Sequence, residues 1–284
     1  MTAASGIAGS VVIADHSFEI TGKDAAALGD MTAHFAPGTA VNVTYLASES
    51  LLARVEACQA AQEHGFRPVP HLAARRIADE VELRQFLSAL RDVGANDEVF
   101  VIGGDPAEPH GPYDDALALI RTGLLQEYGV RRVGITGYPE GHPHIDDSAL
   151  WDALEHKIAA ATEQSMQVSV TTQFGFDAEA VIRWIELVRR RGIIVPIRVG
   201  VPGPVSIRRL LGYARRFGVK SSAGIVSKYG ISLTRLVGSA GPDRFIDALA
   251  RHLTVEHGRV LVHFYTFGDL AATAAWVSAR KERI

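Results

Sequence analysis

Residues 100–113, FVIGGDPAEPHGPY, contain the pattern that decides the fold. The apolar run 100–102 is typical of a buried β-strand, and it stops at two glycines followed by Asp105. Glycine lets the backbone approach another group closely, and an acid at the carboxyl end of a strand often faces a ligand. Residues 113–128, directly behind, have the pattern of a helix. The segment therefore predicts one strand–loop–helix unit with a functional residue in its loop.

The same unit recurs along the whole chain, at a spacing of about 30 residues. Strands are predicted at residues 11–20, 40–46, 67–72, 98–104, 131–139, 167–174, 193–200 and 259–267. Helices are predicted at residues 48–65, 79–93, 113–128, 146–164, 177–191, 204–218, 243–257 and 268–281. Eight such units in 284 residues predict an α/β fold, a closed (β/α)8 TIM barrel that forms a single domain over residues 1–284.

An open, doubly wound sheet is the structural alternative. The chain has no GxGxxG between its first strand and a helix, and no Walker A sequence, which counts against a Rossmann domain. Two regions depart from a regular repeat. The helix at 24–35 is weakly patterned, and residues 219–242 insert additional structure before the last strand.

Composition limits the classes of function. With 47% hydrophobic and 21% charged residues the chain is an ordinary globular protein, and a net charge of −3 gives no field for nucleic acid or an anionic membrane. The single cysteine, Cys58, excludes a disulfide within the chain and fits a reducing compartment. We find no signal peptide and no run near the ~20 apolar residues that a membrane span needs. We expect a cytoplasmic protein.

Polar and aromatic residues occur at the predicted carboxyl ends of most strands, the end of a barrel at which active sites form. Such a lining suits a large, flat, nitrogen-rich ligand. The residues are Glu19, Thr44, Tyr45, His71, Gly104, Asp105, Tyr138, Glu140, His142, Gln173, Pro202, Gly203, His263 and Tyr265. Periodicity alone thus predicts a barrel enzyme with an acid in its site.

Nine short segments together resemble the methylenetetrahydrofolate reductase family, in its order and at about its spacing. They are SFEI (17–20), VTYLA (43–47), PHL (70–72), GGDP (103–106), GYPEGHP (137–143), HK (156–157), TTQFGFD (171–177), VGVPGPVS (199–206) and HFYTF (263–267). The resemblance implies a (β/α)8 flavoprotein. It would pass a hydride from NADH or NADPH through FAD to 5,10-methylenetetrahydrofolate, giving 5-methyltetrahydrofolate. Family members are often dimers or tetramers, so we expect a homo-oligomer.

The resemblance assigns catalytic roles to two acids. Glu19 matches the family's proton donor, which must protonate the leaving nitrogen when the methylene bridge opens, and burial must raise its pKa for this. The alternative for Glu19 is a strand-end glutamate paired with a basic residue. Asp105 matches an acid near folate and flavin, where its charge would favour an iminium cation. It could instead fix the turn before Pro106.

The remaining matches concern binding. Gln173 matches a folate-contacting glutamine, because an amide both donates and accepts at a pterin edge; alternatively it bridges two strands. The residues matched to the flavin site are Thr44, His71, Gly104, Asp105, Tyr138, His142 and Lys157. Lys157 would lie near the cofactor phosphates, or else on an exposed helix face. We set aside a metal site at residues 142–147, since this loop contains a proline and lacks zinc-ligand spacing.

Five positions depart from the family pattern. Gly103 stands where the family has an arginine, and Asp269 reverses the charge of an arginine near the folate tail. The others are Leu150, Ala153 and His156, near the part of the site expected to bind the FAD adenosine and phosphates. A flavin-independent relative, in which the nicotinamide reduces folate directly, therefore stays an alternative. A non-catalytic folate-binding protein is another, although Glu19 argues against it.

Overall fold

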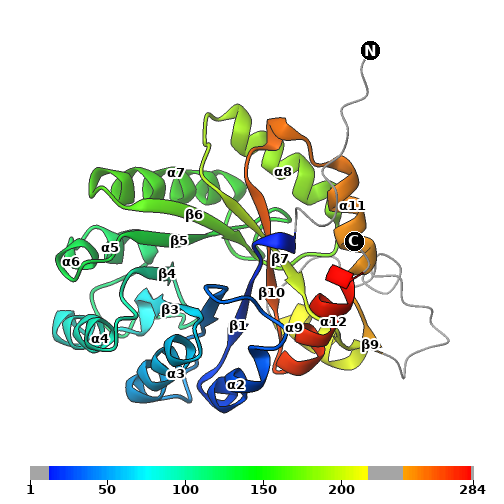
Figure 1. The fold of residues 1–284 in the computed structure, drawn as a ribbon. Coiled ribbons are helices and arrows are strands. Elements are labelled where there is room, and N and C mark those ends of the chain that lie inside the picture. The colour runs from blue at the N-terminus through cyan, green and yellow to red at the C-terminus, as the bar shows by residue number, and fades with distance from the viewer. Residues whose placement is uncertain (1–12, 217–238, 283–284) are drawn as a thin grey trace. The chain divides into compact units, whose positions relative to one another are not determined.

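The structure, a computed structural model, describes residues 13–216 and 239–282 of the 284-residue chain. Eight strands close into a barrel in the order β1-β10-β7-β6-β5-β4-β3-β2, which confirms the predicted (β/α)8 fold (Figure 1). The barrel strands are β1 (Ser17–Ile20), β2 (Ala40–Val43), β3 (Arg67–Ala73), β4 (Glu98–Ile102), β5 (Arg132–Gly137), β6 (Gln167–Thr172), β7 (Ile197–Pro202) and β10 (Val260–Tyr265). Each overlaps a strand predicted from the sequence.

Helices alternate with these strands along the chain. The α-helices are α2 (Leu28–Met31), α3 (Leu51–Glu63), α4 (Glu80–Asp92), α5 (Ala116–Ile120), α6 (Leu124–Glu127), α7 (Asp147–Glu163), α8 (Ala178–Arg190), α9 (Ile207–Arg216), α11 (Asp243–His252) and α12 (Leu270–Glu282). Short 3-10 helices are η1 (Gly22–Ala27), η2 (Ala74–Arg76) and η4 (Val255–His257). Two short strands, β8 (Val205–Ser206) and β9 (Ser239–Ala240), form a separate antiparallel pair.

The backbone packs as two compact units, and each is built from separate parts of the chain. The N-terminal unit comprises Phe18–Thr136 and Trp151–Val170. The C-terminal unit comprises the described residues within 1–17, 137–150 and 171–284. The chain thus passes between the units several times before it ends.

In the N-terminal unit, strands β2 to β5 are parallel neighbours, with His71 opposite Phe100 and Val99 opposite Val133. Their carboxyl ends therefore lie along one edge. Local sequence explains why α4 begins where it does. The carboxylate of Asp79 accepts a hydrogen bond from the backbone N–H of Glu82 at 2.8 Å, which caps the first turn. Its buried residues Leu83, Phe86, Leu87 and Leu90 recur at helical spacing.

In the C-terminal unit, β7 and β10 are parallel, with Val199 opposite Val262. Phe264 contacts the ring of Trp276 on α12 at 5.7 Å between centroids, whereas the rings of His263 and Tyr265 lie 5.0 Å apart. This is the alternation expected for HFYTF in a strand.

Several boundaries differ from the sequence prediction, for local reasons. The helix predicted at 113–128 is divided into α5 and α6 at Gly123, whose φ is +76°. Strand β7 begins only at Ile197, because the carbonyls of Ile193 and Val195 accept hydrogen bonds from Arg189. The predicted first strand begins late, at Ser17. Most of the insertion predicted at 219–242 lies outside the described residues.

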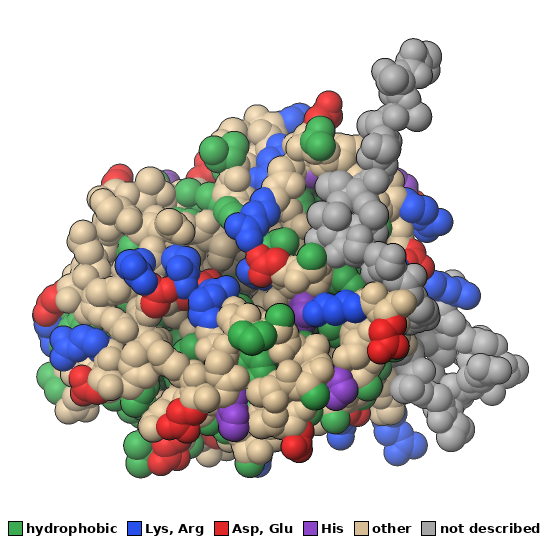
Figure 2. All heavy atoms as spheres, viewed as in Figure 1, with side chains coloured by type: hydrophobic (Ala, Val, Ile, Leu, Met, Phe, Trp, Pro, Cys, Tyr) green, Lys and Arg blue, Asp and Glu red, His purple; other side chains and the backbone are tan. Residues whose placement is uncertain are grey.

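Charge and thiol chemistry are ordinary for a globular protein. Acidic and basic side chains are interspersed on the face shown in Figure 2. Cys58 is buried on α3, and burial raises the pKa of its thiol to about 12, so the group is an inert packing residue. None of the helices within residues 13–216 and 239–282 is long and apolar enough to span a membrane.

Candidate functional site

Glu19 lies on β1 of the N-terminal unit and is half-buried. Burial, the larger cause, and the negative charge of Asp24 together raise the pKa of its carboxyl from 4.5 to about 8. Asp24 is held in place by the backbone N–H and the hydroxyl of Thr21, both at 2.8 Å. Glu19 is therefore an acid that carries its proton at neutral pH.

His71 lies on β3 and is buried against Phe100, with ring centroids 4.8 Å apart. Burial lowers the pKa of its imidazole to about 3, so the ring is neutral in the physiological range. Its Nε2 lies 3.2 Å from the amide nitrogen of Asn42. With that amide donating, Nε2 accepts and Nδ1 carries the ring proton. His71 is thus a neutral hydrogen-bond donor at the carboxyl end of its strand.

Thr44 directly follows β2 and joins its end to β1 by hydrogen bonds. Its backbone N–H and its hydroxyl both donate to the carbonyl of Ile20, at 2.9 and 3.0 Å. The hydroxyl oxygen keeps its capacity to accept a hydrogen bond. Thr44 is thereby fixed one strand away from Glu19.

The loop after β4 is organised by Arg75. The backbone N–H of Arg75 donates to Gly103 at 2.8 Å, and its guanidinium donates to the carbonyls of Pro106 and Asp114 at 2.8 Å each and to that of Ala107. Gly104 has a φ of +100°, a conformation that favours glycine. The turn needs glycine at position 104, and the carbonyl of Gly103 is held by the backbone of Arg75.

Asp105 is exposed and forms an ion pair with Arg76, whose Nε donates to its carboxylate at 2.7 Å. The charge expected at this position is therefore partly compensated. A side chain at Gly103 would meet no atom within 4 Å, so the space beside this residue is open.

Lys157 is buried on α7, where its Nζ lies 3.3 Å from the hydroxyl of Thr136 on β5. Burial lowers the pKa of its ammonium to about 8, while Asp115 raises it in part. The alternative of an exposed helix-face lysine is wrong. His156, in contrast, is exposed on the same helix, and Leu150 and Ala153 are half-buried.

In the C-terminal unit, Tyr138 and His142 are brought together by the turn after β5. The N–H of Gly141 donates to the carbonyl of Tyr138 at 3.1 Å, and the two rings meet edge to face at 5.4 Å. The backbone N–H of His144 donates to Nδ1 of His142 at 3.2 Å. Among residues 13–216 and 239–282, no three His, Cys, Asp or Glu side chains are grouped as metal ligands.

Gln173 directly follows β6. Its backbone N–H donates to Gly137 at 2.8 Å, and its side-chain oxygen accepts from the N–H of Phe174 at 3.1 Å. Glu140 was predicted at a strand end, but the sequence assigned it no role. In the structure its side chain binds the loop after β6. Its Oε1 accepts hydrogen bonds from the backbone N–H groups of Phe176 and Asp177, at 3.0 and 3.3 Å.

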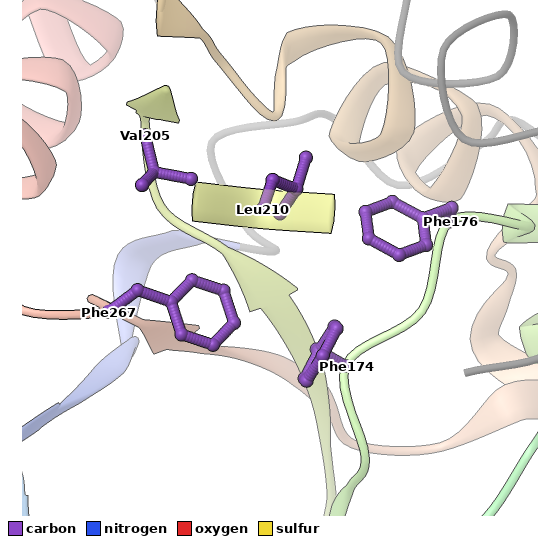
Figure 3. Packing of buried hydrophobic residues seen from close by; sticks show 5 residues of the cluster. All are labelled: Phe174, Phe176, Val205, Leu210 and Phe267. Carbon is purple, nitrogen blue, oxygen red and sulfur yellow. The ribbon is translucent and has the colours of Figure 1, made fainter. Parts of the chain in front are cut away.

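An aromatic cluster packs beside this loop in the same unit. It consists of Phe174, Phe176, Val205, Leu210 and Phe267 (Figure 3). Tyr213 on α9 stacks on Phe267 at 4.3 Å, and the hydroxyl of Tyr265 donates to the carbonyl of Thr172 at 3.1 Å. The cluster supports the loop that carries Gln173.

The side chains of His263, on the last barrel strand, and Asp269, before helix α12, bind groups within the protein. His263 is buried, and its Nδ1 lies 2.8 Å from the hydroxyl of buried Ser17. Asp269 caps α12, because its carboxylate accepts from the N–H of Ala272 at 3.2 Å. Asp269, which replaces the arginine of the family pattern, therefore acts as a helix cap.

Comparisons of sequence and of structure place this chain among known proteins. Residues 27–278 match the family model described as methylenetetrahydrofolate reductase. An uncharacterized protein from Clostridium thermocellum, whose description states that it binds two copies of 5-methyl-5,6,7,8-tetrahydrofolic acid, has a similar fold. Its TM-score is 0.63 at 12% identity, over 99% of this chain and 96% of the other. Dihydropteroate synthase from Thermus thermophilus gives a TM-score of 0.50 at 13% identity, over 99% and 100% of the two chains.

Proposed function

Because the chain belongs to the methylenetetrahydrofolate reductase family, we propose that it reduces 5,10-methylenetetrahydrofolate to 5-methyltetrahydrofolate. NADH or NADPH would supply the hydride. The observation that carries the proposal is Glu19, a carboxyl with a pKa near 8 at the end of a barrel strand. Active sites of barrel enzymes form at this end.

The proton on Glu19 has a defined use in this reaction. It would go to the nitrogen that leaves when the methylene bridge opens; the C–N bond breaks, and the remaining iminium carbon accepts a hydride. A carboxyl that is protonated at neutral pH can donate in this step, whereas an ordinary glutamate cannot. The carboxylate of Asp105 would favour the cation, to an extent set by its ion pair with Arg76.

Folate is the proposed substrate. Gln173 can donate and accept at a pterin edge with one amide, and the aromatic cluster holds its loop in place. The folate-binding protein of similar fold from Clostridium thermocellum supports a folate ligand for this chain as well.

FAD is the proposed cofactor, and the side chains present fit it. When bound, it would carry the hydride from the nicotinamide to the folate. In the N-terminal unit the groups are neutral His71, Thr44, Gly104 and buried Lys157, whose ammonium suits a phosphate. In the C-terminal unit they are the paired rings of Tyr138 and His142.

Direct transfer from the nicotinamide, without a flavin, is the second candidate function. It is favoured by Gly103, which offers no charge, and by exposed His156 and apolar Leu150 on α7. In either case we propose a cytoplasmic homo-oligomer that folds as a single domain.

A visible absorption spectrum of the freshly purified protein tests the cofactor and the reaction together. We expect a flavin spectrum that bleaches on addition of NADH or NADPH and recovers on addition of methylenetetrahydrofolate, with FAD identified after release. A protein that stays colourless with added FAD, yet oxidises NADH when folate is present, would establish direct transfer. Failure to oxidise nicotinamide under both conditions would contradict the proposed reductase.

A further inference from the structure

We propose that Glu140 is a positioning residue that holds the Gln173 loop to the Tyr138–His142 loop, so that the parts assigned to folate and to cofactor keep a fixed spacing. The inference rests on the proposed function for the roles of these two loops. Both loops belong to the C-terminal unit.

The contact is made by one carboxylate oxygen. Oε1 of Glu140 accepts from the backbone N–H groups of Phe176 and Asp177, at 3.0 and 3.3 Å. Bonds from backbone N–H groups to a carboxylate are charge-assisted and stronger than bonds to a neutral acceptor. Glu140 is half-buried, so solvent competes only in part for its oxygen. A single side chain after β5 therefore fixes two successive amides after β6.

Gly175 leaves the space that this contact needs. A Cβ atom on Gly175 would lie 2.5 Å from Oε1 of Glu140, closer than real contacts allow. The loop is thus built with glycine where the carboxylate approaches. The motifs YPEGHP and TQFGFD are distant in sequence but complementary here. YPEGHP contributes the carboxylate, and TQFGFD contributes the two backbone N–H groups and the glycine that leaves room for it.

The contact also reaches helix α8. Asp177 is the N-cap of α8, and its carboxylate accepts from the N–H groups of Glu179 and Ala180 at 3.1 and 3.2 Å. Because Glu140 holds the backbone of this cap, it links the Tyr138 turn to a rigid helix. The base of the loop is held separately, by the bond from Gln173 to Gly137 at 2.8 Å.

This arrangement gives Glu140 a role distinct from that of a catalytic residue. Its oxygen is engaged by backbone groups, and it acts on substrate through the position of Gln173. Hydride transfer depends steeply on the separation of the reacting atoms, so a loop free to move by an ångström would weaken folate binding and slow folate reduction. Since the proposed role of Gln173 is to contact folate, a displaced loop should affect folate reduction more than reaction of the nicotinamide with an artificial electron acceptor.

The test compares Glu140→Ala, which removes the acceptor, with Glu140→Gln, which keeps an oxygen without the charge. Glu179→Ala, an exposed residue on α8, is the matched control. Hydrogen exchange at Phe176 and Asp177 should become about tenfold faster in Glu140→Ala and change less in Glu140→Gln. The KM for methylenetetrahydrofolate should rise about tenfold in Glu140→Ala, with nicotinamide oxidation by an artificial acceptor within about twofold of wild type.

Unchanged exchange at these two amides in a folded Glu140→Ala protein would overturn the inference. So would an equal loss of both activities, which would indicate a general structural role. If Glu140→Ala does not fold, Gly175→Ala tests the same contact from the other side, and it should also accelerate exchange at the two amides. Hydrogen exchange requires no activity, so a wild-type protein without folate reduction would contradict the proposed function and leave this test intact.

Discussion

Burial drives three titratable side chains of the N-terminal unit toward their neutral forms. Glu19 holds its proton up to about pH 8, His71 stays neutral down to about pH 3, and the pKa of Lys157 falls to about 8. Each shift has desolvation as its largest cause. In the reaction proposed here, the acid is the group whose proton is consumed and must be replaced.

Substitution of Glu19 by glutamine should remove both the proton and its pH dependence. Folded Glu19 titrates near pH 8 and the unfolded residue near 4.5, so the folded state binds an additional proton between these values. This stabilising contribution is complete below the unfolded pKa and is lost as pH rises through 8. From pH 5.5 to 8.5 the melting temperature of wild type should therefore fall by a few degrees relative to Glu19→Gln.

Thermal melts at both pH values, together with folate reduction, check this prediction. Glu19→Gln should abolish folate reduction and keep nicotinamide oxidation by an artificial acceptor. Parallel stability profiles for the two proteins would show that the acid is ordinary, and loss of both activities would make Glu19 structural. Asp24→Asn is the control, since it removes only the secondary cause of the raised pKa.

The sequence placed Glu19 at a strand end but could not show how far its side chain is removed from solvent. Its neighbours in β1 point to the other side of the strand, so its burial depends on groups that pack around it in three dimensions. The same holds for Lys157, for which a helical pattern alone left an exposed and a buried position open. Glu140 was found among the strand-end residues, but its partners lie 36 and 37 positions away in the chain.

At the scale of elements, the loop after β4 depends on its neighbour. Arg75 in η2 uses its fork of N–H groups to hold three carbonyls of this loop, those of Pro106, Ala107 and Asp114. A planar guanidinium can serve several acceptors at once, whereas an ammonium cannot hold the same geometry. Asp105 is carried on the loop that Arg75 shapes.

Replacement of Arg75 by lysine should therefore loosen the loop even though the charge is kept. We expect a loss of roughly 2 kcal/mol in the free energy of unfolding, since several hydrogen bonds to backbone carbonyls are removed. Hydrogen exchange should accelerate in residues 103–114. Denaturant unfolding measures the first effect, and Arg91→Lys, at an exposed position, is the control. Equal stabilities of the two variants would indicate that the hydrogen bonds of Arg75 to the loop contribute little to the free energy of unfolding.

Elements were predicted well where local chemistry decides them. Strand β4 follows from its β-branched run, and α4 from its spacing and from Asp79 at its N-cap. The predictions differed from the structure where a single nearby residue overrides the apolar pattern. Arg189 delays the start of β7 by binding two carbonyls, and Gly123 divides a helix whose apolar pattern runs through it.

At the scale of the whole molecule, eight repeats were sufficient to predict the closed barrel. Repeated strand–helix units have few other ways to bury their apolar faces. The division into two units was not predicted, because it depends on packing between segments that are far apart in sequence.

Since each unit contains separate parts of the chain, we expect both to unfold together. Calorimetry should give a single transition whose calorimetric and van't Hoff enthalpies agree. Two resolved transitions would contradict the single-domain prediction. Cofactor-free protein should be used, because a bound ligand shifts the stability of the state to which it binds.

The composition of the units also sets an order of events during protein synthesis. Residues 18–136 leave the ribosome early. The N-terminal unit is complete only after residues 151–170 have also been synthesised. Ser17 belongs to the other unit, which also contains β7 and β10 and is synthesised last. The N-terminal unit can therefore be complete once residue 170 has been synthesised, whereas the C-terminal unit needs the last strand and helix of the chain.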